Sequence, residues 1–334
     1  MSRSKPRINI IGTGGSIAGI GLHRFDYTQY AELGKKLTIE QSLDRIPEAN
    51  DIADIQSENL ISIGSGAIGP IEWLRLSHRI NNLLKTEDTD GVVVTHGTAT
   101  LEETAYFLQL TIKSTKPVVV TGAMRPPTAV GTDADLNLID AIRVAASLEA
   151  VGKGVLTVLN NEIHSARDVH KANTLRVETF RANELGFLGY ADSDEQVVFY
   201  RRTDRAHTVD SEFDVEGIDQ LPRIDIAPAY AGADGLVIRA LAAAGVDGLV
   251  AAGLGSGSSP PPFMAGLKEV SDAGLPVVIA TGTGSGRVMQ TRRFTEDGYI
   301  VADNLMPKKA RILLMLALTK TKDKAEIQRM MLAY

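Results

Sequence analysis

The chain carries a series of short, uninterrupted apolar runs, each ending in small or polar residues. The clearest are RINIIGTGG from residue 7, GVVVTHGT from 91, KPVVVTGAM from 116, GVLTVLNN from 154, DGLVAAGLGSG from 247 and LPVVIATGTG from 275. Continuous rather than alternating hydrophobicity is typical of strands covered on both faces, as in parallel sheets. The pattern therefore predicts a parallel sheet between layers of helices.

Helix-like stretches lie between these runs. LNLIDAIRVAASLEA, residues 136–150, has apolar residues near helical spacing, and the last stretch, KKARILLMLALTK, follows Pro307, a favoured first helical position. Alternation of strand and helix predicts a doubly wound α/β fold. A chain of 334 residues has room for two domains.

A domain boundary is expected between residues 200 and 223, where the sequence is polar, charged and without helical periodicity. Strand and helix alternate again after Pro222. We therefore expect an N-terminal catalytic α/β domain over residues 1–205, a linker over 206–223 and a smaller C-terminal α/β domain over 224–334.

Composition excludes several classes of function. A net charge of −6 argues against a nucleic-acid binder, and the lack of cysteine excludes disulfides, thiolate zinc sites and a cysteine nucleophile. No apolar run is long enough to span a bilayer, and the N-terminus has no signal-peptide pattern. We therefore expect a cytoplasmic enzyme that binds neither membrane nor nucleic acid.

Two glycine-rich loops resemble nucleotide-binding loops but lack their spacing. The dinucleotide fingerprint needs a third glycine, where GTGGSIAG has Ile17 and GTGSGR has Arg287. The first loop instead places Thr13 at the end of a strand, in a turn whose backbone N–H groups could approach a ligand or a developing oxyanion. The alternative is a turn that only needs the conformational freedom of glycine.

The segment THGTATLEET holds three further candidates. Thr100 and Glu103 have the spacing of a capping box, which leaves Thr98 unexplained by helix capping. His96 is either a general base or a structural histidine, and no neighbours at metal-ligand spacing accompany it, so neither a metal nor another cofactor is expected. In HSARDVHKANT, Lys171 belongs either to a solvated loop or to a proton shuttle.

Together these segments resemble the bacterial asparaginase/glutaminase family of two-domain amidohydrolases. The likeness runs through GTGGSIAG, THGTATLEETAYFL, KPVVVTGAMRPPTAVGTDADLNL, SARDVHKANT and LMPKKARILLMLALTKTKD in this order. The resemblance implies a large N-terminal and a small C-terminal α/β domain. It also implies a homotetramer of intimate dimers, in which the partner's C-terminal domain closes each site around a small amide.

The resemblance implies roles for individual residues. Thr13 matches the threonine that attacks the amide carbonyl, and Tyr27 matches the loop tyrosine that assists it. Thr98 and Lys171 match the second threonine and the lysine that pairs with it.

Substrate-binding residues follow from the same resemblance. Ser57 and Glu58 match the pair that holds the α-carboxylate and α-amino groups, and Glu58 is the variant of members that also accept glutamine. The other expected substrate contacts are Gly12, Gly97, Ala99, Ala123 and Met124.

The chain departs from the family at the substrate's α-ammonium. Ala99 stands where the family has an aspartate, and Ser258 stands where the partner subunit usually supplies an asparagine. The usual interface glutamate is not evident, and Arg292 and Arg293 occur near its place. Loss of one buried charge partner typically costs several kcal/mol, about 3–5, so binding of free asparagine should be weakened.

Three readings stay open at this point. The chain is an asparaginase with altered binding, or an amidase for a related amide whose α-amino group is missing, acylated or replaced. The third reading is a catalytically weak ligand-binding protein on the same fold, against which the joint retention of Thr13, Thr98 and Lys171 counts.

Overall fold

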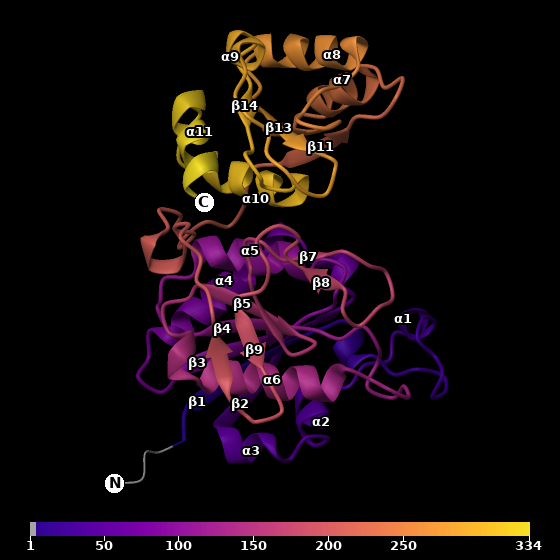
Figure 1. Cartoon of the computed structure of the whole chain (residues 1–334), viewed down its shortest axis with the longest axis vertical. Coiled ribbons are helices and arrows are strands. Elements are labelled where there is room, and N and C mark those ends of the chain that lie inside the picture. Colours follow the sequence, from indigo (N-terminus) through magenta and orange to yellow (C-terminus); the bar gives the residue numbers. More distant parts are fainter. Residues whose placement is uncertain (1–4) are drawn as a thin grey trace. The chain divides into compact units, whose positions relative to one another are not determined.

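The structure, a computed structural model, describes residues 5–334. These residues form a larger N-terminal unit that ends at Gly217 and a smaller C-terminal unit, each with its own sheet and helices (Figure 1). The predicted α/β class, with a large first and a small second domain, is confirmed.

The N-terminal unit is built on an eight-stranded sheet in the order β10-β9-β6-β5-β4-β3-β1-β2. Its strands are β1 (Arg7–Gly14), β2 (Asp54–Ile63), β3 (Gly91–Thr95), β4 (Val118–Thr121), β5 (Val155–Leu159), β6 (Glu162–Ser165), β9 (Gly189–Ala191) and β10 (Val197–Phe199). Five neighbouring strands, β2, β1, β3, β4 and β5, are parallel. Four of them, all except β2, are apolar runs for which the sequence predicted this arrangement. The other three are antiparallel, which the sequence pattern did not predict.

The change of direction occurs at Asn160 and Asn161. Both have positive φ, 53° and 64°, and they join β5 to β6 as the two central residues of a hairpin. Asparagine tolerates this conformation, which a two-residue hairpin of this hand requires. The terminal NN of GVLTVLNN therefore marks a hairpin, not the exit toward another crossover helix.

Helices cover both faces of this sheet (Figure 1). One apolar core lies between the sheet and helices α4 (Pro70–Leu84) and α5 (Leu101–Thr111). The other core lies against α2 (Ile39–Leu43), α3 (Ala49–Ile52) and α6 (Ala134–Ala146). Alternate residues of one strand enter different cores, since Val92 and Val94 pack in the first and Val93 in the second. Burial on both faces explains why the strand sequences are continuously apolar.

Short elements complete the N-terminal unit. They are η1 (Ser16–Ala18), α1 (Tyr30–Leu33), η2 (Ser65–Ala67), η3 (Leu148–Ala150), β7 (His170–Lys171), β8 (Phe180–Arg181) and η4 (Thr208–Asp210). Strands β7 and β8 form a separate antiparallel pair, which holds Lys171.

The C-terminal unit has a four-stranded parallel sheet in the order β11-β12-β13-β14. Its elements are β11 (Ile224–Pro228), α7 (Leu236–Ala243), β12 (Gly248–Gly253), α8 (Pro261–Asp272), β13 (Val277–Thr281), α9 (Arg292–Glu296), β14 (Ile300–Val301), α10 (Pro307–Ala317) and α11 (Lys324–Ala333). Helix α10 begins at Pro307, as predicted.

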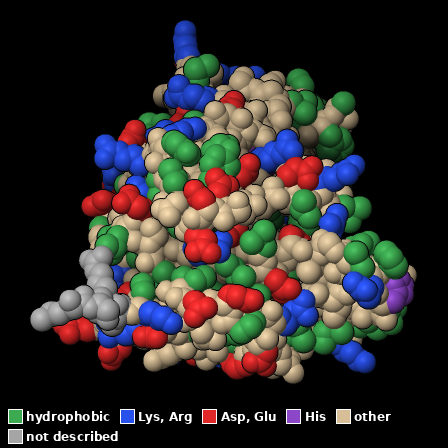
Figure 2. Space-filling view, turned by 60° about the horizontal axis from the view of Figure 1, so that its bottom comes forward, with side chains coloured by type: hydrophobic (Ala, Val, Ile, Leu, Met, Phe, Trp, Pro, Cys, Tyr) green, Lys and Arg blue, Asp and Glu red, His purple; other side chains and the backbone are tan. Residues whose placement is uncertain are grey.

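Acidic and basic side chains are interspersed on the face drawn in Figure 2, with apolar side chains scattered between them. Among the described residues, no helix has the length and apolar character needed to cross a membrane.

Candidate active site

Thr13 lies near the carboxyl end of β1, where the chain turns sharply. Gly14 and Gly15 follow it with φ of 92° and 82°, a conformation that favours glycine. The Thr13 side chain is fully buried, and its Oγ1 donates to the carbonyl oxygen of Thr95 at 2.8 Å. Because Thr95 ends the neighbouring strand β3, this bond ties together the ends of the two strands that carry the threonine motifs.

The loops after β1 and β3 meet through their backbones. A Cβ atom on Gly15 would lie 2.2 Å from the Cα of Gly97, which no side chain can tolerate. A Cβ on Gly97 would in turn lie 2.8 Å from the Cα of Gly15. Only a glycine pair permits this approach, which brings the Thr13 loop beside the loop that carries Thr98.

Thr98 and Lys171 form the direct contact expected of the second threonine and its lysine. The Lys171 Nζ donates to Thr98 Oγ1 at 2.8 Å, although the residues are far apart in sequence. The Lys171 backbone N–H donates to Glu102 Oε2 at 2.8 Å, and Glu102 is a buried residue of the first turn of α5. Lys171 therefore contacts the Thr98 loop through its side chain and the first turn of α5 through its backbone.

Thr100 does not form the predicted capping box. It occupies the N-cap position of α5 without a side-chain cap, and its hydroxyl donates to the carbonyl oxygen of Ser65 at 2.7 Å. The acceptor of that hydrogen bond, Ser65, was not among the residues predicted from the sequence. A Cβ on Gly97 would lie 2.7 Å from Ser65 Oγ, so Ser65 borders the same loop as Thr98.

Ser57 and Glu58 do not lie at this site. They pair with Ile10 and Ile11 in the body of β2, before the level of Thr13. Ser57 donates to a Glu40 carboxylate oxygen at 3.4 Å.

Glu58 accepts a hydrogen bond from Arg79 Nε at 2.5 Å. Ser57 and Glu58 were expected to bind the substrate, but they lie within β2, which continues beyond them to Ile63. The residues that follow the carboxyl end of this strand are Gly64 and Ser65. The link between Glu58 and glutamine acceptance loses its basis. The GSG that follows the strand is the same small, polar ending that marked the other strands, and it could have identified Ser65.

Of the two nearby tyrosines, the one that reaches the Thr13 loop is Tyr30. Its hydroxyl donates to Ser16 Oγ at 2.9 Å, and Ser16 begins η1 directly after the glycine turn. The Tyr27 hydroxyl donates instead to the carbonyl oxygen of Val130 at 3.0 Å. The structure therefore does not bring the Tyr27 hydroxyl to Thr13.

Three other expected substrate contacts are engaged in packing. Ala123 is fully buried in a cluster with Ile17 and Ala134, and the Met124 backbone N–H donates to an Asp133 carboxylate oxygen at 2.9 Å. A Cβ on Gly12 would approach Asn59 Oδ1 at 3.0 Å.

Ala99 differs from these three residues, because it is exposed beside the buried Thr98. Among the expected substrate contacts, Ala99 therefore leaves room for a ligand group next to the Thr98–Lys171 pair.

His96 is a structural residue in this arrangement. It is fully buried, and its Nδ1 lies 2.8 Å from the Gly97 carbonyl oxygen, which can only accept. Its Nε2 lies 2.9 Å from Thr104 Oγ1, which also accepts the indole N–H of Trp73 at 2.9 Å. Donors and acceptors match along this chain when the ring is neutral with its proton on Nδ1. Burial lowers the pKa of His96 to about 4, in agreement with a neutral ring.

We expect replacement of His96 by glutamine to leave kcat within about three-fold, because a buried, fully bonded ring is not available as a base. The free energy of unfolding should fall by about 1–3 kcal/mol through the broken hydrogen bonds. Ammonia release and urea denaturation measure the two effects. A hundred-fold loss of kcat would contradict the structural role.

The same variant should change how stability depends on pH. The His96 pKa is about 4 in the folded protein and about 6.5 when unfolded, so stability falls as pH drops through this window. The slope is at most about 1.4 kcal/mol per pH unit. Urea titrations of the parent between pH 7 and 4.5 should show this loss, and His96→Gln should show less of it.

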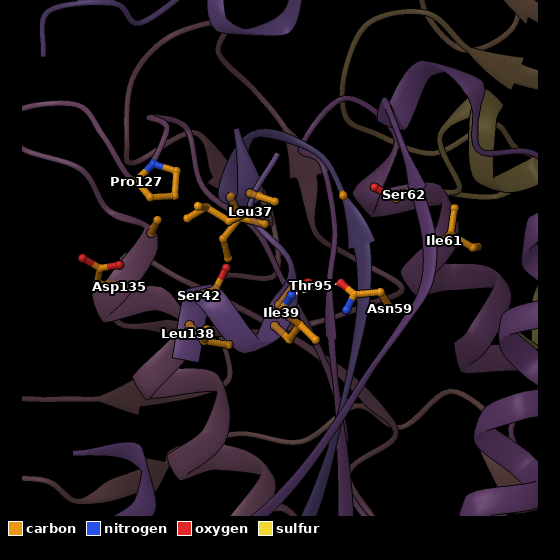
Figure 3. Close-up of a pocket in the computed structure, with 15 residues that line it drawn as sticks. Leu37, Ile39, Ser42, Asn59, Ile61, Ser62, Thr95, Pro127, Asp135 and Leu138 are labelled. Atoms are coloured by element: carbon orange, nitrogen blue, oxygen red, sulfur yellow. Dashed lines mark hydrogen bonds between the residues drawn. The ribbon is translucent and has the colours of Figure 1, made fainter. Parts of the chain in front are cut away.

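A pocket borders the end of β1 at Gly12 and Gly14, and Figure 3 shows its lining residues. It is lined by Gly12, Gly14, Ile17, Ala18, Leu37, Ile39, Ser42, Asn59, Ile61, Ser62, Thr95, Pro127, Ala134, Asp135 and Leu138. Thr13, Thr98 and Lys171 do not line it, because Gly12 and Gly14 face it while Thr13 alternates to the other side of β1. This pocket is therefore separate from the side chains of Thr13, Thr98 and Lys171.

In the C-terminal unit, three residues named in the sequence analysis, Ser258, Arg292 and Arg293, lie on the surface. Ser258 is exposed in the loop after β12. Arg292 and Arg293 lie on α9, where they pair with Glu296 at 2.7 Å and Asp297 at 3.6 Å. Within residues 5–334, no group of three or more His, Asp or Glu side chains could hold a metal ion.

The geometry suits acyl transfer. A buried hydroxyl lies at a glycine turn, and a second hydroxyl bonded to an amine lies in the adjoining loop. A hydroxyl nucleophile needs such a neighbouring base and nearby backbone donors.

Two family models match the chain almost end to end. The model described as "Asparaginase, N-terminal" matches residues 7–205, and the model described as "Glutaminase/Asparaginase C-terminal domain" matches residues 223–331.

Individual proteins are similar over the same length. L-asparaginase 2 of Bacillus subtilis is 43% identical over 97% of this chain and 85% of its own length. The glutaminase-asparaginase of Pseudomonas fluorescens is 40% identical over 97% of this chain and 90% of its own. The crystal structure of a probable cytoplasmic L-asparaginase from Campylobacter jejuni superposes with a TM-score of 0.95 at 42% identity, covering 99% of this chain and all of that one.

Proposed function

Because this chain belongs to the asparaginase/glutaminase family, whose members hydrolyse linear amides, we propose that it cleaves a side-chain amide through an acyl-enzyme on Thr13. The observation that carries this proposal is the 2.8 Å contact between Lys171 Nζ and Thr98 Oγ1, in a loop that adjoins the Thr13 loop at Gly15. It supports a proton-accepting threonine–lysine pair beside the Thr13 nucleophile, because Thr13 lies at the end of β1 and Thr98 follows the neighbouring strand β3.

In the proposed reaction, the Thr13 hydroxyl attacks the amide carbon and its proton passes to the leaving nitrogen. Backbone N–H groups of the glycine turn stabilise the oxyanion. The C–N bond breaks, ammonia or an amine leaves, and water then hydrolyses the ester to a carboxylic acid and free Thr13. Lys171 with Thr98 relays the protons. We assign the assisting tyrosine to Tyr30 in place of Tyr27, since its hydroxyl bonds to Ser16 in the same loop.

The substrate contacts are revised in the same way. We propose that Ser65, instead of Ser57, contacts the polar end of the substrate, because it borders Gly97 and accepts the Thr100 hydroxyl at its carbonyl. Gly66 follows it as an exposed residue without a side chain, and Ala99 is exposed as well. Neither residue provides an anion for a substrate ammonium.

We therefore propose altered specificity, with weak recognition of a free α-ammonium. Two substrate classes fit this site. One is asparagine or glutamine bound weakly, and the other is an asparagine-related amide whose α-amino group is absent or acylated. The lack of a carboxylate at Ala99 favours the second class, because a substrate without an ammonium then leaves no anion of the site without a partner.

Ammonia release from asparagine, glutamine, N-acetylasparagine and succinamate distinguishes these classes. We expect kcat/KM to be higher for succinamate or N-acetylasparagine than for asparagine. Efficient turnover of asparagine, at the level of the other two or above, would contradict the altered specificity. Reaction with none of these amides, together with no effect of Thr13→Ala on ligand binding, would favour a binding protein.

The variant Ala99→Asp should restore recognition of the ammonium. We expect kcat/KM for asparagine to rise by about ten-fold, the effect of one partly solvated charge pair. The value for succinamate should stay level or fall, because it has no ammonium to pair. Ala99→Asn, which has the same shape without the charge, is the control. Equal gains for Asp and Asn would show that charge recognition is not the cause.

We also propose a homotetramer of intimate dimers in which a partner's C-terminal unit completes each site, and a cytoplasmic location. The family relationship supports the assembly, and the similarity to the probable cytoplasmic L-asparaginase from Campylobacter jejuni supports the location. Sedimentation of the purified protein and cell fractionation test the two statements.

A further inference from the structure

Tyr27 and Tyr30 belong to the same loop, residues 20–34, but their side chains contact different partners. The Tyr30 ring packs against Gly19, where a Cβ would lie 2.7 Å from Tyr30 Cδ2, and its hydroxyl bonds to Ser16. Tyr27 contacts residues 125–131, here named the docking segment. Its hydroxyl donates to the Val130 carbonyl oxygen at 3.0 Å.

Two further hydrogen bonds join the residues before Tyr27 to the docking segment. The Gly21 N–H donates to Thr128 Oγ1 at 2.9 Å, and the Val130 N–H donates to the Arg24 carbonyl oxygen at 2.8 Å. The first half of the loop is therefore bound to the docking segment along its length.

The partner of the Tyr27 ring is held in place independently of the loop. The Arg125 guanidinium carbon lies 5.5 Å from the centre of the Tyr27 ring, a cation–π distance. Arg125 Nη1 donates to the Gly131 carbonyl oxygen at 2.7 Å, and the Arg125 backbone N–H donates to an Asp133 carboxylate oxygen at 2.9 Å. The cation is thus fixed by the docking segment itself.

The loop also has internal order, which allows it to dock as one piece. The buried Asp26 carboxylate accepts the backbone N–H groups of Leu22, Thr28 and Gln29 at 2.7–3.1 Å. The Leu22 N–H, with those of Gln29 and Thr28, holds the pKa of Asp26 below its ordinary value. These hydrogen bonds link Leu22 to Thr28 and Gln29, so Tyr27 lies within one hydrogen-bonded segment that leads directly into Tyr30.

We propose that Tyr27 and Arg125 are positioning residues that dock this loop and thereby present Tyr30 to the Thr13 loop. The role of Tyr30 in this inference rests on the proposed function, whereas the docking does not. Loss of one docking contact shifts the loop equilibrium toward the undocked form. A saturating substrate that binds only the docked form shifts the equilibrium back. Docking variants should therefore raise KM and spare kcat.

The rate of limited trypsin digestion measures loop docking in the absence of substrate. Cleavage between the exposed Arg24 and Phe25 requires release of the Arg24 carbonyl from Val130, so its rate follows the undocked population. Tyr27→Phe removes the hydroxyl and keeps the ring, and Arg125→Gln removes the cation. We expect each to speed this cleavage about three- to five-fold, the effect of one weak contact.

Steady-state kinetics with the best amide substrate complete the test. Tyr27→Phe and Arg125→Gln should raise KM about three- to five-fold and keep kcat within two-fold, while Tyr30→Phe should lower kcat about 100-fold. Tyr200→Phe, at a tyrosine 69% exposed after β10, is the matched control and should change neither readout.

Unchanged trypsin rates in both docking variants would overturn the proposal. So would a 100-fold loss of kcat in Tyr27→Phe at saturating substrate, which would make Tyr27 the assisting tyrosine. If no amide is turned over, the proposed function fails, and faster cleavage of both docking variants still supports the docking.

Discussion

Replacing Thr13 with valine should lower kcat for amide hydrolysis by about 10⁴-fold or more, the scale of removing a covalent nucleophile. Valine matches the shape of threonine and lacks only the hydroxyl. The lost bond to the Thr95 carbonyl should cost about 1 kcal/mol of stability, so the variant should fold. Ammonia release at saturating substrate and urea denaturation measure the two quantities.

The acyl-enzyme itself can be detected in the parent. Acid quenching during turnover followed by trypsin digestion should give the peptide of residues 8–24 with the mass of one added acyl group. This peptide also contains Ser16, so fragmentation must place the group on Thr13, and Ser16→Ala should still be acylated. Turnover by Thr13→Val within ten-fold of the parent, or acylation at Ser16, would refute Thr13 as the nucleophile.

Lys171→Met should lower kcat by about 10³-fold, within the range for loss of a general base. Methionine keeps an unbranched chain and removes the amine that contacts Thr98 Oγ1. The backbone N–H that bonds to Glu102 is unchanged, so the local strand should stay in place. Lys85→Met, at a surface lysine paired with Glu216, is the control and should keep full activity.

A double-mutant cycle tests whether Thr98 and Lys171 act as one unit. Thr98→Val alone should cost nearly as much kcat as Lys171→Met, and the double variant should be little worse than either. Additive losses would mean that the two residues act separately, and the contact between them would then have no part in proton transfer.

Local patterns were sufficient to predict most of the fold. The six apolar runs became β1, β3, β4, β5, β12 and β13, and the helix at Pro307 began where expected. The antiparallel part was missed because β6, β9 and β10 are only three or four residues long. Strands this short have little periodicity, and their pairing depends on distant segments of the chain.

The candidate site was predictable where its residues lie in contiguous motifs at strand ends, as with Thr13 and Thr98. The site was not predictable where a side chain hydrogen-bonds to a residue distant in the sequence. Thr100 bonds to Ser65 instead of capping its own helix, and Tyr27 bonds to Val130 instead of approaching Thr13. In each case a tertiary acceptor competed with the local pattern, and sequence spacing carries no information about such an acceptor.

The contact between Gly15 and Gly97 has a consequence for how such enzymes diversify. The spacing of the two threonine loops is set by backbone against backbone, so changes in surrounding side chains leave it intact. Exposed residues such as Ala99 and Gly66 lie outside this contact, so their replacement does not alter it. A lineage can therefore exchange one substrate for another at the rim while inheriting the same reaction centre.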